Sequence, residues 1–141
     1  MNPTCPSTAG CSLLALLALL PLGGCREAAP TGDPGLILEL AISPTPPGVG
    51  PARLIISLRD TLGNPVEGAD VNVEGNMNHA GMVPVTGTAL RQGPGLYVLP
   101  EFRFTMAGSG VLTATATLPD GREARTRKNT DVVGPPQRGH L

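Results

Sequence analysis

One stretch of the chain concentrates side chains that can bind a soft metal ion. Residues 74–84 read Glu-Gly-Asn-Met-Asn-His-Ala-Gly-Met-Val-Pro and hold two of the four methionines and one of the two histidines. The pattern Met77-x-His79-x-x-Met82 puts two thioethers and an imidazole in one loop, and this soft, neutral donor set favours Cu(I) over harder divalent ions. Met106 ends a later strand and could complete the coordination if the two loops meet. Met77, His79, Met82 and Met106 are therefore the candidate copper(I) ligands.

The same residues also fit a structural interpretation. Methionine fills irregular gaps in protein cores, and Met77 continues the inward phase of Val71 and Val73. Met106 shares a strand face with Val98, Phe102 and Phe104 in the predicted alternation, and a single loop histidine is often only solvent-exposed or hydrogen-bonded. Spacing alone leaves both interpretations open, a metal site and a packed loop.

Other kinds of chemistry have little support in the sequence. His79 and His140 are far apart, and no Ser or Cys stands on a recognisable nucleophile elbow. No Gly-rich phosphate loop precedes a helix. The net charge is −1, the basic residues form no groove-sized patch, and the three aromatic residues offer no platform for stacking bases. We therefore expect neither an enzyme nor a nucleic-acid partner.

The N-terminus is typical of a bacterial lipoprotein signal. The apolar run 13–20 is too short to span a bilayer and suits a signal core, although the preceding residues hold no Lys or Arg. It leads into Leu22-Gly23-Gly24-Cys25, which resembles a lipobox ending in the cysteine that is acylated. The alternative is a buried apolar helix of a cytosolic protein, which would sit in an otherwise β-type chain. We predict a signal peptide over 1–24 and lipidation at Cys25.

This interpretation also predicts where the mature chain resides. Cys5 and Cys11 would leave with the signal, so the one remaining thiol, Cys25, would carry lipid and none would be left for disulfides or nucleophilic chemistry. We expect an exported protein held by lipid on the cell membrane or the outer membrane, facing the periplasm or the cell exterior. A lipidated tether over 25–35 and a loose tail over 134–141 would flank one domain at 36–133.

The domain has the pattern of an all-β fold. Apolar residues alternate with polar ones at a period of two, as in Leu54-Ile55-Ile56-Ser57-Leu58, and Gly/Pro clusters separate the runs. The Leu118-Pro119-Asp120-Gly121 segment is a tight hairpin signal. We predict a seven-stranded antiparallel immunoglobulin-like β-sandwich, with strands near 36–43, 52–59, 69–75, 84–91, 95–105, 110–118 and 122–133.

Four segments carry a resemblance to a known family. They are Gly-Asn-Pro-Val-Glu-Gly-Ala-Asp-Val at 63–71, Asn-Met-Asn-His-Ala-Gly-Met-Val-Pro-Val at 76–85, Gly-Pro-Gly-Leu-Tyr at 93–97 and Phe-Thr-Met-Ala-Gly at 104–108. Over about residues 36–133 the chain resembles a YtkA-like domain, the group related to FixH. It departs from the usual pattern in having His79 alone in the loop, and in lacking an aromatic residue at 109–111.

The resemblance implies an immunoglobulin-like sandwich in an exported or membrane-anchored protein. Some relatives sit beside copper-handling or cytochrome-oxidase assembly functions, which implies a partner of that kind. Two hypotheses follow. The first is a lipid-anchored module that binds or delivers Cu(I) through Met77, His79 and Met82, with Met106 as a further ligand. The second is a non-metal interaction or scaffolding module for a membrane partner.

Overall fold

The computed structural model describes residues 31–135. The predicted signal segment, Cys25 and residues 136–141 lie outside this range. Within it, no helix is long and apolar enough to cross a membrane. The described part of the chain is built from eight strands: β1 (Thr31–Gly32), β2 (Leu36–Ser43), β3 (Gly50–Asp60), β4 (Asp70–Met77), β5 (Val85–Gly93), β6 (Leu96–Phe104), β7 (Gly108–Thr117) and β8 (Glu123–Val132).

The prediction of an all-β antiparallel fold is confirmed. Each of the seven predicted strands is present within two residues of its predicted bounds. The structure adds one strand, β1, in which Thr31 pairs with Arg125 and Gly32 with Ala124. The predicted hairpin also forms, because the Gly121 N–H donates to the Leu118 carbonyl at 2.9 Å. The strand count is therefore eight rather than seven.

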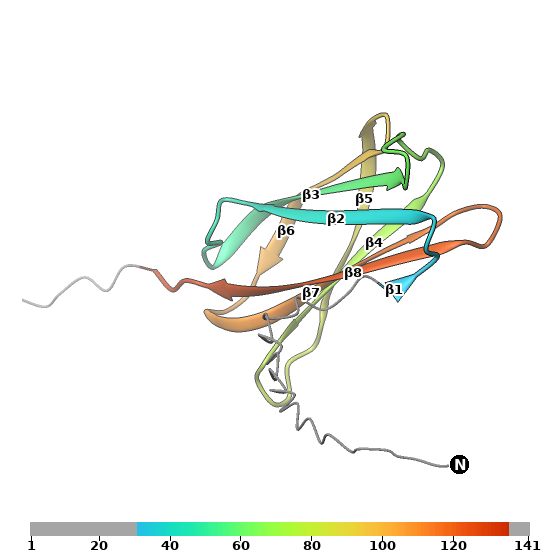
Figure 1. Cartoon of the computed structure of the whole chain (residues 1–141). Helices are drawn as coiled ribbons and strands as arrows, with labels where there is room; N and C mark the ends of the chain where they lie inside the picture. Colours follow the sequence, from blue (N-terminus) through green and yellow to red (C-terminus); the bar gives the residue numbers. More distant parts are fainter. Residues whose placement is uncertain (1–30, 136–141) are drawn as a thin grey trace, which may run out of the picture.

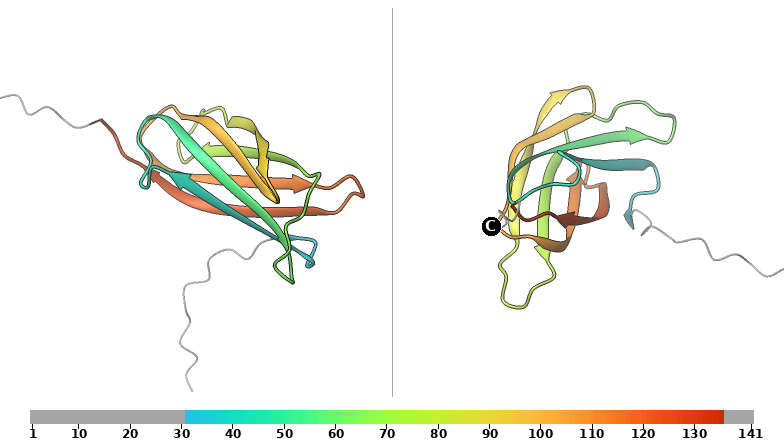
Figure 2. Two further views of the ribbon diagram at one scale, coloured as in Figure 1. Left: turned by 90° about the horizontal axis from the view of Figure 1, so that it is seen from above. Right: turned by 90° about the vertical axis from the view of Figure 1, so that its left-hand side faces the viewer.

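The strands form two sheets that share β5. Sheet 1 has the order β1-β8-β7-β4-β5, and sheet 2 continues from β5 through β6 and β3 to β2. The first half of β5 pairs with β4, as at Ala89 opposite Val71, and the second half pairs with β6, as at Leu90 opposite Val98. Figures 1 and 2 show the strands of the two sheets crossing at an angle. At the open side, β2 of sheet 2 lies against β8 of sheet 1, so the sandwich is nearly closed.

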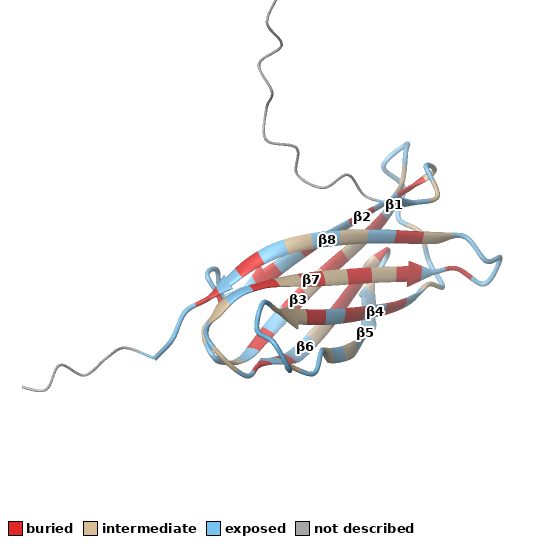
Figure 3. Ribbon diagram, turned by 90° about the horizontal axis from the view of Figure 1, so that it is seen from below, coloured by how far each residue is buried: buried red, intermediate tan, exposed pale blue. Residues whose placement is uncertain are grey.

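The core lies between the two sheets and follows the predicted alternation. Along β7 the side chains of Leu112, Ala114 and Ala116 are buried and the threonines between them are more exposed, as Figure 3 shows by its alternating colours. Leu54, Ile56 and Leu58 of β3 are 0 % exposed, which makes this strand the centre of the core. Within residues 31–135 the core cluster falls between Leu36 and Val132, so a chain of residues 26–141 contains the whole of this core.

The prediction that Val98 shares a strand face with Phe102 and Phe104 is wrong. The pairing of β3 with β6 shifts register between Ala52 and Leu54, so β6 has an irregularity between Leu99 and Phe102. Tyr97 therefore joins Phe102 in the core, whereas Val98 is buried outside the core cluster. A bulge of this kind reverses the alternation beyond it, which a strict period of two cannot anticipate.

The loop joining β3 to β4 (residues 61–69, the β3–β4 loop) is held firmly by side chains from other elements. The buried Tyr97 hydroxyl accepts a hydrogen bond from the Ala69 N–H at 3.2 Å and donates to the Val66 carbonyl at 3.3 Å. The Glu67 carboxylate accepts from Arg91 Nε at 2.5 Å and from the Gly95 N–H at 3.1 Å. The hydrogen bond from Arg91 is the main reason that the pKa of Glu67 lies below its ordinary value.

Candidate functional site

The candidate ligands Met77, His79 and Met82 lie where β4 passes into β5. We call residues 77–84 the Met/His loop; it projects at the lower end of sheet 1 in Figure 1. The Asn78 N–H donates to the Ser109 carbonyl at 3.0 Å, which ties the loop to β7. The Met82 N–H donates to the His79 carbonyl at 3.4 Å, and Gly81 supplies the φ of 80° that this turn requires. The loop therefore folds back over the start of β7.

Met77 is the last residue of β4 and lies opposite Gly110 of β7. Its side chain is partly buried and packs against the core, in agreement with the inward phase expected from the sequence. The thioether occupies the space that a side chain at Gly110 would need, since a Cβ built there would lie 2.7 Å from Met77 Sδ. Glycine at position 110 is thus what allows the sulfur to lie against the β7 backbone.

His79 is solvent-exposed and lies over the first residue of β7. A Cβ built on Gly108 would lie 3.0 Å from His79 Nε2. Gly108 also has a φ of 128°, a conformation that other residues rarely adopt. The thioether of Met77 and the imidazole of His79 therefore lie over two glycines that are two positions apart in β7. The sequence predicts Met77 and His79 as candidate ligands but gives no sign of a role for these two glycines. Their position beside the candidates follows from the pairing of β4 with β7.

The two remaining candidates flank this pair. Met106 is half-buried in the turn between β6 and β7, two residues before Gly108, the glycine over which His79 lies. Met82 is half-buried in the Met/His loop. The contacts of the described residues bring Met77 and His79 to the same backbone segment, and the Met82 N–H donates to the His79 carbonyl.

The donor chemistry at this end of the molecule is soft. Residues 31–135 contain no group of three or more His, Cys, Asp or Glu side chains placed to hold a metal ion. A site here must therefore use thioether sulfur together with the single imidazole. That donor set fits Cu(I), and it is poorly suited to zinc, calcium or magnesium.

A model of the YtkA-like family matches residues 37–109, slightly more than half of the 141 residues. The chain belongs to the YtkA-like family. This confirms the resemblance seen in the sequence, and the matched segment contains the whole Met/His loop as well as Gly108. No curated protein matches the chain.

Solved structures match the domain, and one of the matches bears on its fold. The crystal structure of CopC from Methylosinus trichosporium OB3b matches with a TM-score of 0.50 and 20% identity, covering 75% of this chain and 98% of that one. An engineered protein matches with a TM-score of 0.43 and 20% identity, covering 71% of this chain and 20% of its own length. The CopC structure supports the β-sandwich assignment, because the match covers that chain almost completely. The sequence identity is too low for the match to show more than the fold.

Proposed function

We propose that this YtkA-like domain is an exported, lipid-anchored module that binds Cu(I) through Met77, His79 and Met82, with Met106 as a further ligand. The observation that carries the proposal is that Met77 Sδ lies over Gly110 and His79 Nε2 lies over Gly108. A Cβ at either glycine would crowd a donor atom, so the backbone of β7 leaves space where the soft donors gather.

The donor set suits a carrier of copper rather than a catalyst. Two thioethers and a neutral imidazole hold Cu(I) without adding charge, and His79 is exposed, so an acceptor protein can reach the site. Such a site releases its cargo by ligand exchange with an acceptor that offers better donors. The family resemblance makes a copper-handling or oxidase-assembly protein the natural acceptor.

The exposed loop surface supports a second candidate function. Val83 follows Met82 directly and is 81% exposed, and its neighbour Pro84 is also exposed. Large apolar side chains at a loop tip are typical of contact surfaces. A non-metal interaction or scaffolding module would use this tip to hold a membrane partner, with Met77 acting only as a packing residue.

A competitive Cu(I) titration distinguishes the two functions. Residues 26–141 would be titrated against a chromogenic Cu(I) chelator, with Asn78→Ala as the matched control, because Asn78 lies between the ligands and offers no soft donor. Loss of a ligand in His79→Ala or Met82→Leu should weaken binding by more than the roughly 10-fold that loss of an outer-shell partner costs. Unchanged affinity in a variant lacking all of Met77, His79 and Met82 would exclude the copper function.

The proposed anchor is tested separately. Changing Cys25 to Ser should leave the precursor uncleaved and abolish lipid attachment at that position. Fractionation of cells that produce each form, followed by detection of the protein in membrane and soluble fractions, measures this. An unchanged membrane fraction and an unchanged mass for the Cys25→Ser chain would contradict lipidation.

A further inference from the structure

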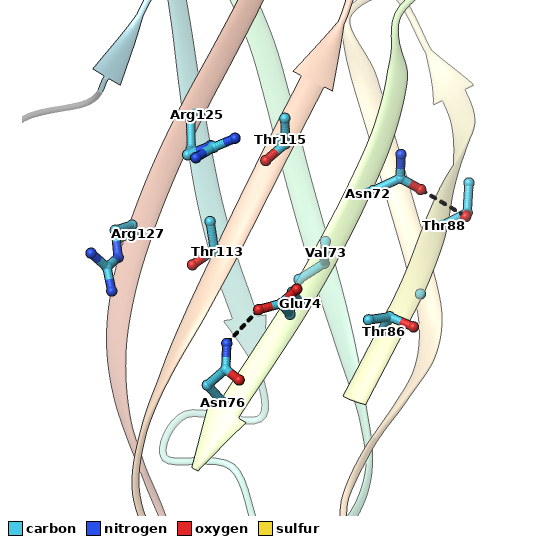
Figure 4. A pocket seen from close by; sticks show the side chains of 11 residues that line it. Asn72, Val73, Glu74, Asn76, Thr86, Thr88, Thr113, Thr115, Arg125 and Arg127 are labelled. Atoms are coloured by element: carbon cyan, nitrogen blue, oxygen red, sulfur yellow. Dashed lines mark hydrogen bonds between the residues drawn. The ribbon is translucent and has the colours of Figure 1, made fainter. Parts of the chain in front are cut away.

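The outer face of sheet 1 carries a polar hollow that is distinct from the Met/His loop. The hollow encloses about 740 Å³ and is open to solvent (Figure 4). Its side chains come from alternate positions of four adjacent strands, and the strand register arranges them in rows. One row runs across the sheet as Thr88, Asn72, Thr115 and Arg125. The next row is Thr86, Glu74, Thr113 and Arg127.

Several polar groups of this hollow are already paired within the protein. Asn72 Oδ1 accepts from the Thr88 hydroxyl at 2.9 Å, and Glu74 accepts from Asn76 at 2.5 Å. Arg125 forms an exposed ion pair with Glu123 at 3.1 Å. These bonds fix the side chains in place, and each leaves capacity unused, such as the amide N–H groups of Asn72.

The guanidinium of Arg127 has no such partner. Among the described residues it forms neither an ion pair nor a side-chain hydrogen bond, and neither do the hydroxyls of Thr113 and Thr115. Thr113, opposite Arg127 in β7, is neutral. The carboxylate of its own row, Glu74, is two strands away, at roughly 10 Å. This edge of the hollow is therefore positively charged, with free donors directed at solvent.

The shape and composition define the class of ligand. Four strands span three interstrand gaps, or roughly 14 Å, so the donors suit an extended molecule better than a single small ion. All three aromatic residues, Tyr97, Phe102 and Phe104, are buried in the core, so the hollow offers no stacking surface. Recognition must depend on hydrogen bonds from threonine and asparagine and on guanidinium–carboxylate pairing.

A peptide fits this surface less well than a sugar chain. Both β4 and β7, which form the middle of the hollow, are paired on each side, so a peptide lying across them cannot add as a further strand. The hollow contains no exposed apolar side chain against which an apolar side chain of a peptide could pack. Glu74 in the middle accepts hydrogen bonds from hydroxyl groups but repels a continuous run of carboxylates. We propose that the hollow binds an acidic oligosaccharide, whose hydroxyls contact β4 and β7 and whose carboxylates contact Arg127 and Arg125.

The proposal is tested by amide chemical-shift titration of ¹⁵N-labelled residues 26–141 with tri-galacturonate, at low salt. We expect shifts confined to residues 72–76, 86–88, 113–115 and 125–127. Arg127→Ala should weaken binding by about tenfold or more, because it removes a hydrogen-bonded charge pair. Arg53→Ala is the matched control, since Arg53 is also an exposed strand arginine but belongs to sheet 2.

Three results would overturn the proposal. The first is an absence of shifts at the hollow, or shifts that are identical with maltotriose, the neutral trisaccharide. The second is equal binding of acetate or inorganic phosphate, which would make the hollow a site for simple anions only. The third is binding of oligo-glutamate without binding of tri-galacturonate, which would assign the surface to acidic peptides. None of these results bears on the copper function, because the hollow and the Met/His loop share no residue.

Discussion

The two ends of β4 emerge into loops that are held in opposite ways. Before β4, the β3–β4 loop is bound by the Tyr97 hydroxyl and the Glu67 carboxylate, each of which makes two hydrogen bonds to partners distant in sequence. After β4, residues 78–84 form no side-chain hydrogen bond with any other described residue and depend on a few backbone bonds. At the first end side-chain hydrogen bonds fix the loop, whereas at the second end Met77 and His79 occupy the space that Gly110 and Gly108 leave.

This difference would separate stability from the proposed copper binding along a single strand. A loop fixed by several hydrogen bonds, three of them part-buried, is costly to disturb, because a lost partner can leave a polar group unsatisfied. A loop seated on glycines can adjust its side chains around an ion at little cost to the fold. We therefore expect substitutions at the Tyr97 end to lower the free energy of unfolding and substitutions in the Met/His loop to lower metal affinity.

The largest effect should come from a matched pair of glycine substitutions. Gly95 and Gly81 both have positive φ, of 60° and 80°. A Cβ at Gly95 would lie 2.5 Å from the Leu58 carbonyl oxygen, whereas a Cβ at Gly81 meets nothing within 4 Å. Gly95→Ala should cost about 3 kcal/mol or more through clash and strain, and Gly81→Ala about 1 kcal/mol through strain alone. Urea unfolding measures both, and equal costs would contradict the contrast between the two ends.

Removing the Tyr97 hydroxyl should have the next largest effect. Tyr97→Phe keeps the ring in the core but leaves the Ala69 N–H without its acceptor and the Val66 carbonyl without a donor. The expected loss is about 1–3 kcal/mol in the free energy of unfolding, with little change in the denaturant slope. A variant as stable as the parent would show that water replaces the hydroxyl at this end.

At the other end, Met77→Leu should change function more than stability. The substitution preserves volume and core packing, so the free energy of unfolding should fall by less than about 1.5 kcal/mol. It removes a thioether, so Cu(I) affinity should drop by more than about tenfold in the chelator competition. The reverse outcome, normal affinity in a strongly destabilised variant, would make Met77 a packing residue alone.

The smallest effect should appear in the pH dependence of stability in the acid range. The pKa of Glu67 is lowered, first by its hydrogen bond with Arg91, so Glu67 stabilises the fold above its ordinary pKa of 4.5. That stabilisation is lost as the pH falls through the lowered value. Glu67→Gln should therefore flatten the decline of the urea midpoint in this acid range. Asp120→Asn makes the matching change in the distant β7–β8 turn, where hydrogen bonds from Arg122 also lower the pKa of Asp120, and it should flatten the decline in the same way. Parallel decline in the parent and Glu67→Gln chains would contradict the role given to Glu67.

Most of the fold could be predicted from the sequence because its signals are local. Alternation of apolar residues and Gly/Pro punctuation located seven strands, since each depends on a few consecutive residues. The two-residue strand β1 has no period to detect. The division of β5 between two sheets, and the irregularity that turns Tyr97 rather than Val98 toward the core, arise from pairing between strands. Neither feature can be predicted from any single segment of the sequence.

The candidate site was predictable only in part, for the same reason. The spacing of Met77, His79 and Met82 within one loop predicts them as candidate donors, which remains a prediction. The space they occupy depends on Gly108 and Gly110, which belong to a strand that follows two others in the chain yet pairs with β4. The polar hollow could not be predicted either, because each of its rows takes one residue from each of four strands.

The place where the chain enters sheet 1, at β1, lies far from the Met/His loop. The chain joins sheet 1 at β1, where Gly32 lies beside Ala124, and Ala124 in turn lies opposite Ala116 of β7. Gly110, the neighbour of Met77, comes six residues before Ala116 in the same strand, which corresponds to roughly 20 Å. Under the proposed lipid anchor, the chain would therefore enter the domain near one end of β7, while His79 lies over the other end. An acceptor protein would then meet the candidate copper site one strand length, roughly 20 Å, away from the point where the anchored chain enters the sheet.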